Sequence, residues 1–223
     1  MKTLVSALVV LTGLAVGSSA AAQDPVKSNP DVYSVVLENA KVRVLRANVK
    51  AGGKTTMHDH PDTVVIALSD ARVKFTGADG KAAEVPLKAE TATWTPADKH
   101  MGENLEKNAA EVVLVELKPS KGPAATIPTN RPEMKITPFF DNARVMAYRA
   151  TTSPKFQEAA GTTHDFDQVI VALQDTDAVA VTVEGKVKSS WKRGDVLFIG
   201  RGMKHESKNN GSKSADVIVV AVK

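Results

Sequence analysis

The sequence contains two copies of one segment, and this duplication constrains the fold more than any other feature. The stretch Asp62–Asp70 reads almost the same as Asp167–Asp175, at an offset of 105 residues. The same offset pairs further residues down to the end of the chain: Gly80 with Gly185, His100 with His205, Asn104 with Asn209, and Val112 with Val217. A histidine, a turn glycine and the apolar spacing are kept together. The chain is therefore predicted to fold as two tandem units of one kind.

The repeat predicts where each unit begins and ends. Upstream of the shared stretch the match resumes with a two-residue slip, Glu38–Val42 against Asp141–Val145. The two copies then span residues 36–118 and 139–223. Residues 119–138 between them are rich in proline, so we expect an extended connector along the surface.

Short apolar runs separated by turn residues predict an all-β fold. Examples in the first copy are Val42–Val49, Val64–Leu68, Val73–Thr76 and Val112–Leu117. Asp79-Gly80 and Glu184-Gly185 are typical of hairpin turns between strands. Beyond residue 22 no segment shows a sustained helical period. We therefore expect a closed or double-sheet barrel in each copy.

Residues 1–22 have the pattern of a cleaved signal peptide. Lys2 precedes an apolar run from Leu4 to Val16, and small residues up to Ala22 offer a cleavage site before Gln23. The run of about 13 apolar residues is too short to span a bilayer core, which needs roughly 20. We expect a periplasmic or secreted protein whose mature chain has no membrane span.

Composition narrows the classes of partner. The net charge of +4 is spread along the chain without a basic run, which argues against nucleic-acid binding. The chain has no cysteine, so neither a disulfide nor thiolate chemistry is available. A small-molecule ligand or substrate remains the expected partner, and the sequence does not indicate an oligomeric state.

The five histidines are confined to corresponding places in the two copies. His58 and His60 are two residues apart, so in a strand both imidazoles point to the same face. His100 precedes the last strand of its copy and reaches the same interior if the two strands are neighbours. Three neutral imidazoles suit a divalent transition metal, namely Fe, Zn, Mn, Ni or Cu. The alternative is three exposed loop histidines.

These motifs resemble those of the cupin superfamily. Gly52-x5-His58-x-His60 is similar to its first motif and His100-x3-Asn104 to the end of its second. In the second copy, Gly194-Asp195-x4-Gly200-x-Gly202-x2-His205-x3-Asn209 is similar to the second motif, with Gly200 in place of the usual proline. The resemblance covers residues 36–223 and implies a bicupin, with two double-stranded β-helix (jelly-roll) barrels. It also implies that His58, His60 and His100 are metal ligands inside the first barrel.

The sequence departs from the cupin pattern in three places. Members usually carry a glutamate four or five residues after the second histidine, where this chain has Val64 and Val65. The site is then a three-histidine site, or it recruits Asp62 as a fourth ligand because Asp62 shares strand parity with His58 and His60. In the second motif, Pro96 lies one residue closer to His100 than usual, and Ala97 or Asp98 stands in place of the glycine.

The second copy is expected to hold a degenerate site. At the offset of 105, Thr163 and Asp165 replace His58 and His60, and His164 falls where Asp59 stands, facing outward. His205 would then have only Asp165 and Asp167 as neighbours, unless a bulge turns His164 inward. A structural barrel, or one that binds a ligand without metal, is the favoured interpretation.

Two functions of different classes fit these observations. One is a metal-dependent enzyme of dioxygenase, lyase or isomerase type acting on a small molecule. The other is a non-catalytic barrel that binds a metal or small ligand. Candidate accessory residues are Asp62 and Glu103 as general bases, Arg46 and Arg149 as anion-binding residues, and Trp94 at the barrel mouth. For all of these except Asp62, a surface or packing role is the favoured interpretation.

Overall fold

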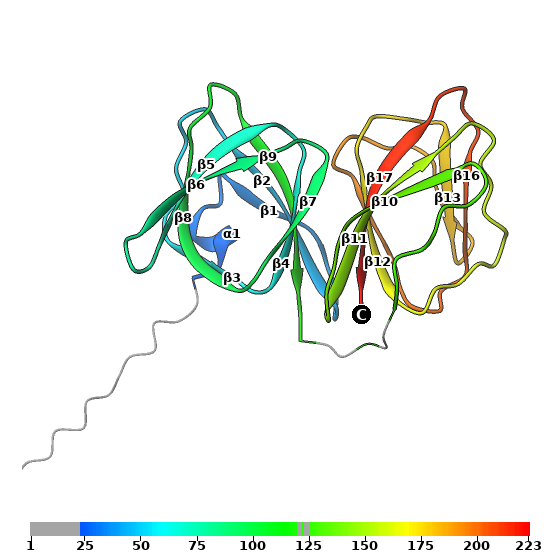
Figure 1. Ribbon diagram of the computed structural model, residues 1–223, viewed down its shortest axis with the longest axis horizontal. Helices are drawn as coiled ribbons and strands as arrows, with labels where there is room; N and C mark the ends of the chain where they lie inside the picture. Colours follow the sequence, from blue (N-terminus) through cyan, green and yellow to red (C-terminus); the bar gives the residue numbers. More distant parts are fainter. Residues whose placement is uncertain (1–22, 120–121, 123–124) are drawn as a thin grey trace, which may run out of the picture.

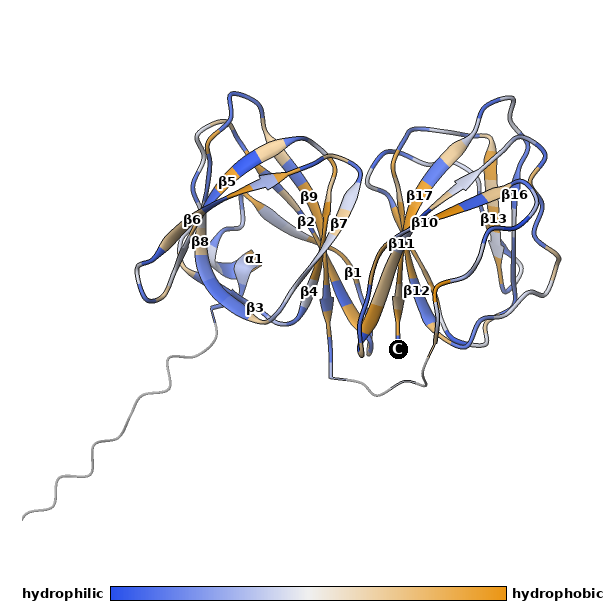
Figure 2. Ribbon diagram, viewed as in Figure 1, coloured by the Kyte–Doolittle hydropathy of each residue, from blue (hydrophilic) through white to orange (hydrophobic). Residues whose placement is uncertain are grey.

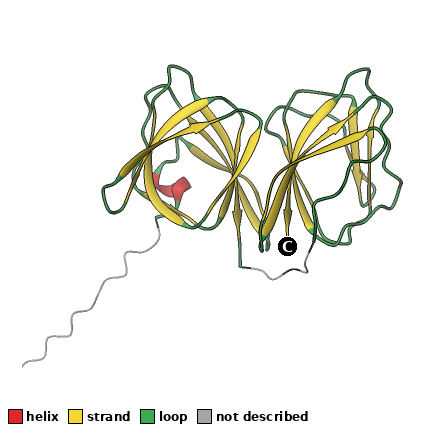
Figure 3. Cartoon of the chain, in the orientation of Figure 1, coloured by secondary structure: helices red, strands yellow, loops and turns green. Residues whose placement is uncertain are grey.

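The computed structural model describes residues 23–119, 122 and 125–223, which form two barrels side by side (Figure 1). The predicted signal peptide, residues 1–22, lies outside the described residues. Strands make up almost all of the regular structure, and the helix shown in Figure 3 is the short α1, Pro25–Ser28. None of the helices in the described part of the chain is long and apolar enough to cross a membrane. The predicted all-β fold is confirmed.

The first barrel consists of two sheets. Strands β1 and β2 (Tyr33–Glu38, Val42–Val49) pair with β9, β4 and β7 (Ala110–Leu117, Thr63–Ala67, Thr91–Thr95) in the order β1-β2-β9-β4-β7. The second sheet has the order β3-β8-β5-β6 (His58–His60, Asp98–Asn104, Ala71–Gly77, Ala82–Leu87). Every pairing is antiparallel. Helix α1 lies against β1 and β3.

The second barrel repeats this plan. Its five-stranded sheet has the order β10-β11-β17-β12-β15 (Met134–Asp141, Val145–Thr152, Ala215–Val222, Asp167–Ala172, Val196–Ile199). Its smaller sheet has the order β14-β13-β16 (Lys186–Lys188, Val179–Val183, His205–Asn209). The position of β3 is taken by an isolated bridge between Thr162 and His205. The two units begin earlier than the repeat suggests, because β1 starts at Tyr33 and β10 at Met134.

Local features of the duplication are visible in the backbone. The register of β1 on β2 shifts between Val35 and Leu37, and that of β10 on β11 shifts at the equivalent place, between Pro138 and Phe140. In each barrel a buried asparagine fixes a loop through its side-chain amide. Asn104 donates to the carbonyl oxygens of Val49 and Asn108, and Asn209 donates to the equivalent carbonyls of Thr152 and Lys213.

The constant offset of 105 is wrong in detail. It holds where Val64 pairs with Val115 and Val169 pairs with Val220. In the same two strands, however, Val64 also pairs with Trp94 and Val169 with Phe198, so β15 matches β7 at an offset of 104. One-residue differences in the turns therefore move whole strands by one position, which changes the residue that faces the barrel interior.

The barrels are joined by the outer faces of their five-stranded sheets. One continuous cluster of buried side chains crosses the junction, drawn as facing orange strands in Figure 2. It includes Val64, Ile66, Val113 and Val115 from the first barrel, and Val169, Val171, Ile218 and Val220 from the second. Trp94, considered at the barrel mouth, packs against this cluster instead. Because each of these sheets is covered on its outer face, the barrels form one packed body.

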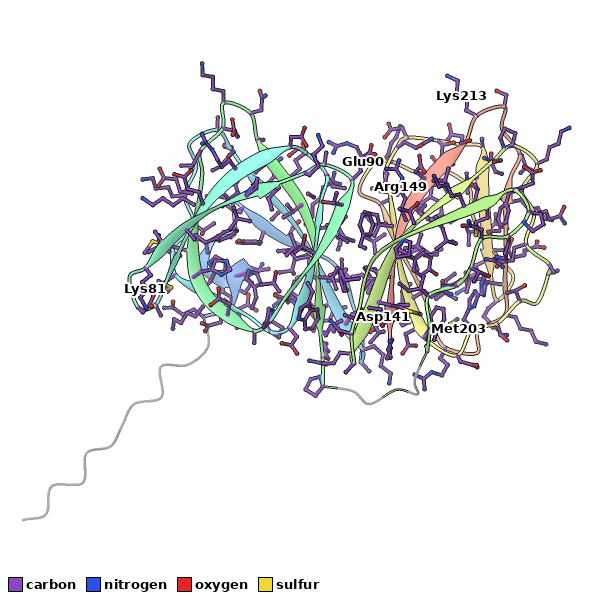
Figure 4. All side chains as sticks on the ribbon, viewed as in Figure 1. Lys81, Glu90, Asp141, Arg149, Met203 and Lys213 are labelled. Atoms are coloured by element: carbon purple, nitrogen blue, oxygen red, sulfur yellow. The ribbon has the colours of Figure 1, made fainter. Side chains whose placement is uncertain are left out.

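Charged side chains close the rim of this junction. Arg193 of the second barrel donates to the carbonyl of Leu68 at 2.7 Å and to the carboxylate of Glu111 at 2.7 Å. Arg149 pairs with Glu90 at 2.9 Å, and the two side chains lie between the barrels in Figure 4. Gly194 has a φ of +84°, and a Cβ there would lie 2.8 Å from Leu68. Only glycine fits this approach, which accounts for one glycine of the second motif.

We expect the chain to unfold as one cooperative unit, which an Ile66→Ala substitution tests. Ile66 is fully buried in the junction cluster, so its truncation should cost about 2–5 kcal/mol. Trp94 and Trp191 each report on one barrel, in variants where the other tryptophan is replaced by phenylalanine. The urea midpoint of unfolding should shift by the same amount whether it is followed by the fluorescence of Trp94 or by that of Trp191. Val187→Ala, at a side chain that is 64% exposed, is the control. Two separate transitions would contradict this prediction.

Candidate metal centre

The structure brings His58, His60 and His100 together inside the first barrel. β3 pairs with β8 so that His58 lies opposite His100, and His60 follows on the same face of β3. One ring nitrogen from each histidine lies within 4.8 Å of the others. The ring centroids are 4.9 Å apart for His58 and His60 and 4.9 Å apart for His58 and His100. The alternating side-chain direction of a strand therefore suffices to gather all three rings.

Each of the three rings has an acceptor at its Nδ1 atom. The acceptor for His58 is the carbonyl of Thr56 at 2.7 Å, for His60 the carboxylate of Glu116 at 2.7 Å, and for His100 the carboxylate of Asp98 at 3.1 Å. These acceptors place the proton on Nδ1 and leave Nε2 of each ring with its lone pair. Metal-binding histidines are oriented in this way by their other nitrogen. The donor set therefore fits a divalent transition metal.

Sequence reasoning missed two residues of this site, Tyr33 and Glu116, and Glu116 is the one that left a signal. It lies on β9 with 3% of its surface exposed, facing the barrel interior. Arg43, its partner across β2 and β9, has a guanidinium nitrogen 3.6 Å from the Glu116 carboxylate and binds Asp24 at 2.7 Å. A lone glutamate in the apolar run Val112–Leu117 was the available signal, because a buried carboxylate needs a partner.

The segment before β1 packs behind the histidines. Asp24 caps α1 by accepting hydrogen bonds from the backbone of Val26 and Lys27. Asn29 accepts a hydrogen bond from the backbone of Thr56 at 2.7 Å. The backbone of Gln23 donates to Asp59 at 2.6 Å, between the two histidines of β3. This segment therefore fixes β3, a strand of only three residues, from outside the barrel.

Burial keeps the imidazoles of His58 and His100 neutral. Desolvation lowers the pKa of His58 from 6.5 to about 4. The hydrogen bond that His58 donates to the carbonyl of Thr56 opposes this shift, and the neighbouring His60 and His100 lower the pKa further. Desolvation also lowers the pKa of His100, although Asp98 opposes it. Burial, with Glu116 nearby, raises the pKa of Tyr33 well above its ordinary value. The Tyr33 hydroxyl lies 3.0 Å from Nε2 of His58 and donates to it. At neutral pH His58 and His100 are therefore uncharged and able to bind a cation.

The other candidate residues from the sequence form ion pairs away from the three histidines. Asp62 is not a ligand in this arrangement, because Pro61 separates β3 from β4 and the chain crosses there to the other sheet. Its carboxylate pairs with Arg144 of the second barrel and accepts from the backbone of Ala97. Glu103 lies on the outer side of β8 and pairs with Lys54 at 3.1 Å. Arg46 and Arg149 both lie at the junction of the barrels, bound to Glu111 and Glu90.

The second barrel gathers a different set from the one predicted. Glu158, His164 and His205 place one ligand atom each within 4.8 Å of one another. The expectation that His164 faces outward is wrong, since its ring lies 4.9 Å from that of His205. Asp165 is exposed, and Asp167 is buried but accepts from the backbone of Arg201, so neither joins the cluster.

A one-residue shift explains the position of His164. His58 lies opposite His100, and in the second barrel Thr162 takes that place opposite His205. His164 is therefore the counterpart of His60 at an offset of 104, and one residue is gained before β12. Glu158, the third member, already has other partners: it binds Arg131 at 3.0 Å and accepts from Ser207 at 3.0 Å.

The cavities of the two barrels differ greatly in size. The first barrel encloses a space of about 510 Å³ that His60 and His100 border. The second encloses about 90 Å³ around His164 and His205. Three large residues fill the second barrel: Tyr148, at the place of Leu45, together with Trp191 and Ile199. A space of several hundred Å³ is typical of small-molecule sites, so the first barrel alone has room for one.

Comparison with solved structures identifies the fold. The chain is similar to AerE from Microcystis aeruginosa, with a TM-score of 0.61 and 11% identity over 86% of this chain and 97% of that one. It is similar to salicylate 1,2-dioxygenase from Pseudaminobacter salicylatoxidans, with a TM-score of 0.61 and 8% identity over 82% and 71%. Oxalate decarboxylase from B. subtilis gives 0.60 and 12% over 85% and 71%. The fold is that of the cupins.

Sequence comparison adds nothing to this assignment. No protein-family model matches the chain, and no curated protein matches it. At identities of 8–12%, the structural likeness establishes the arrangement of strands and leaves the chemistry to the residues of the site.

The metal-free protein should lose stability as the pH falls from about 6.5 to about 4. In the unfolded chain His58 titrates near 6.5, whereas in the folded protein it stays neutral down to about 4. The unfolded state therefore binds a proton that the folded state excludes, which favours unfolding in this window. Urea midpoints of chelator-treated protein at several pH values test this. His58→Gln should flatten the dependence, and an unchanged slope in that variant would contradict the assignment.

Proposed function

We propose that the protein is an exported bicupin whose first barrel binds a divalent transition metal through His58, His60 and His100. The observation that supports this most directly is that an acceptor at every Nδ1 leaves the Nε2 atom of each of the three rings without a proton. The proposal that the protein is exported and cleaved before Gln23 rests on the pattern of residues 1–22.

We further propose that the metal-loaded barrel is an enzyme acting on a small molecule, of dioxygenase, lyase or isomerase type. A bound metal with three neutral ligands would supply a Lewis acid with open coordination positions. The protein supplies the surroundings: His60 and His100 border a cavity of about 510 Å³ that a substrate can enter. Salicylate dioxygenase and oxalate decarboxylase, which share the fold, are named for reactions on small molecules.

The chain's own residues have separate tasks in this proposal. Glu116 orients His60 and stabilises the proton on its Nδ1. Asp98 does the same for His100 and also borders the cavity, where its carboxylate can accept a proton from a substrate. The Tyr33 hydroxyl, which now donates to His58, becomes available to a substrate when that nitrogen binds a metal.

Protein purified without chelators should contain about one equivalent of a transition metal, and its N-terminus should be Gln23. His60→Ala and His100→Ala should each reduce the metal content well below one equivalent, because two imidazoles hold such ions weakly. His164→Ala is the matched control in the second barrel and should leave the content unchanged. Elemental analysis of the four proteins decides this. Equal, low metal content in all of them would reject the proposed metal centre and favour a non-catalytic barrel.

Glu116→Gln should weaken metal binding by about 10–100-fold, the usual effect of removing a carboxylate behind a ligand histidine. Glutamine keeps the size of the side chain but removes the charge that His60 and Arg43 share. Glu103→Gln makes the same change on the outer side of β8 and should have no effect. Competition with a chelating dye measures the affinities. Equal losses in both variants would show that the effect is nonspecific.

A further inference from the structure

The cavity above the histidines of the first barrel is walled mainly by aliphatic and aromatic side chains. Val65, Val73, Phe75, Val112 and Leu114 line it from both sheets. His60, His100 and Tyr33 form its polar end. A ligand that reaches the metal ligands must therefore bury most of its surface against hydrocarbon, and this favours an apolar body.

The described lining of this cavity offers no free cation to an anionic ligand. Apart from the histidines, its charged residues are Lys88 and Asp98. The Lys88 side chain is 77% exposed, and its amine binds Asp70, which does not line the cavity, at 3.0 Å. Arg46 and Arg149, the arginines considered for anion binding, are held by carboxylates at the junction of the barrels.

The carboxylates beside the ligand histidines also disfavour an anionic ligand. Glu116 contacts His60, and Asp98 contacts His100, so a divalent ion at the proposed centre is already faced by two negative charges. Arg43 offsets part of this charge, but it is shared with Asp24. An anionic ligand would therefore meet little net positive charge and would still lose its hydration on entering the cavity.

A row of threonines provides hydrogen bonds without charge. Thr91, Thr93 and Thr95 alternate along β7 and all border the cavity, while Trp94 faces the junction. The Thr91 hydroxyl donates to the carbonyl of Lys88 at 2.7 Å, so it can only accept from a ligand. In the second barrel the counterparts of Thr93 and Thr95 are Leu197 and Ile199, by the pairing of β12 with β15. Hydroxyl groups at this wall are thus present in the first barrel, which has the larger cavity, and are replaced by aliphatic side chains in the second. They suit hydroxyl or carbonyl groups on a ligand.

We infer that the substrate of the first barrel is an uncharged, largely apolar molecule that carries hydroxyl or carbonyl groups. This inference rests on the proposed function, since it names the substrate class of the same site. The apolar walls select the body of the molecule, the threonine row selects its polar groups, and the missing cation disfavours anions.

A matched pair of probes tests the inference on the full-length, metal-loaded protein at pH 7. 2-Naphthol is neutral at this pH, and 2-naphthoate has the same rings with a negative charge. Calorimetric titration should show naphthol binding at least about tenfold more tightly than naphthoate, a difference of about 1.4 kcal/mol. Equal or tighter binding of naphthoate, or no binding of either probe, would overturn the inference.

Thr93→Arg locates the binding and tests its electrostatic cause. Thr93 is exposed on the edge strand β7, so arginine can be accommodated there and adds a cation at the cavity. Naphthoate should then gain about tenfold in affinity. Val187→Arg on β14 of the second barrel is the control and should change neither probe. No gain in Thr93→Arg would also contradict the inference.

The metal content of the same samples separates the two proposals. Protein that holds a metal but prefers naphthoate would refute the substrate class and leave the metal centre intact. Protein that binds naphthol equally well with and without a metal, and that is isolated without one, would refute the metalloenzyme while the ligand class stands.

Discussion

The apolar contact between the two five-stranded sheets determines what the strands of both barrels can contain. Its residues alternate with those that face the barrel interiors, so the central strands are buried on both sides. Such strands are nearly continuous apolar runs, and a polar side chain within them must find a partner. Glu116 is such a case: its neighbours Val115 and Leu117 face the other barrel, and its carboxylate faces inward to Arg43 and His60.

Because the outer faces are used for the junction, the two copies differ mainly in what their inner faces hold. In the second barrel, Met146 and Ala221 stand at the places of Arg43 and Glu116 and form an apolar cluster with Phe166. The second barrel therefore has no carboxylate at the place of Glu116, and the buried carboxylate near its histidines is that of Glu158, 3.5 Å from Nε2 of His205. One barrel has kept polar residues around an open space, and the other has filled that space with larger side chains.

Local patterns in the sequence were enough to predict the fold and the three histidines of the first barrel. Strand alternation, hairpin turns and the repeat are properties of neighbouring residues, and His58 and His60 share a face by spacing alone. Features that depend on pairing were not predictable. His164 was misplaced because the gained residue lies in an irregular segment, and Glu116 is 56 residues from His60 along the chain. Asp62 was considered as a ligand only because the break between β3 and β4 was not visible.

The position of the carboxylate explains how a site without the usual glutamate can still hold a metal. In the cupin pattern that glutamate would contact the ion directly, whereas Glu116 contacts His60 on its far side. A carboxylate in this place makes the imidazole a better donor and fixes its tautomer, while it occupies no coordination position. The charge lies close enough that it would stabilise a bound ion, and the space where the glutamate would stand remains part of the cavity, bordered by Val65. With the acidic group on the strand behind His60 and not on the inner wall, the cavity beside the three histidines is larger than it would be with the usual glutamate.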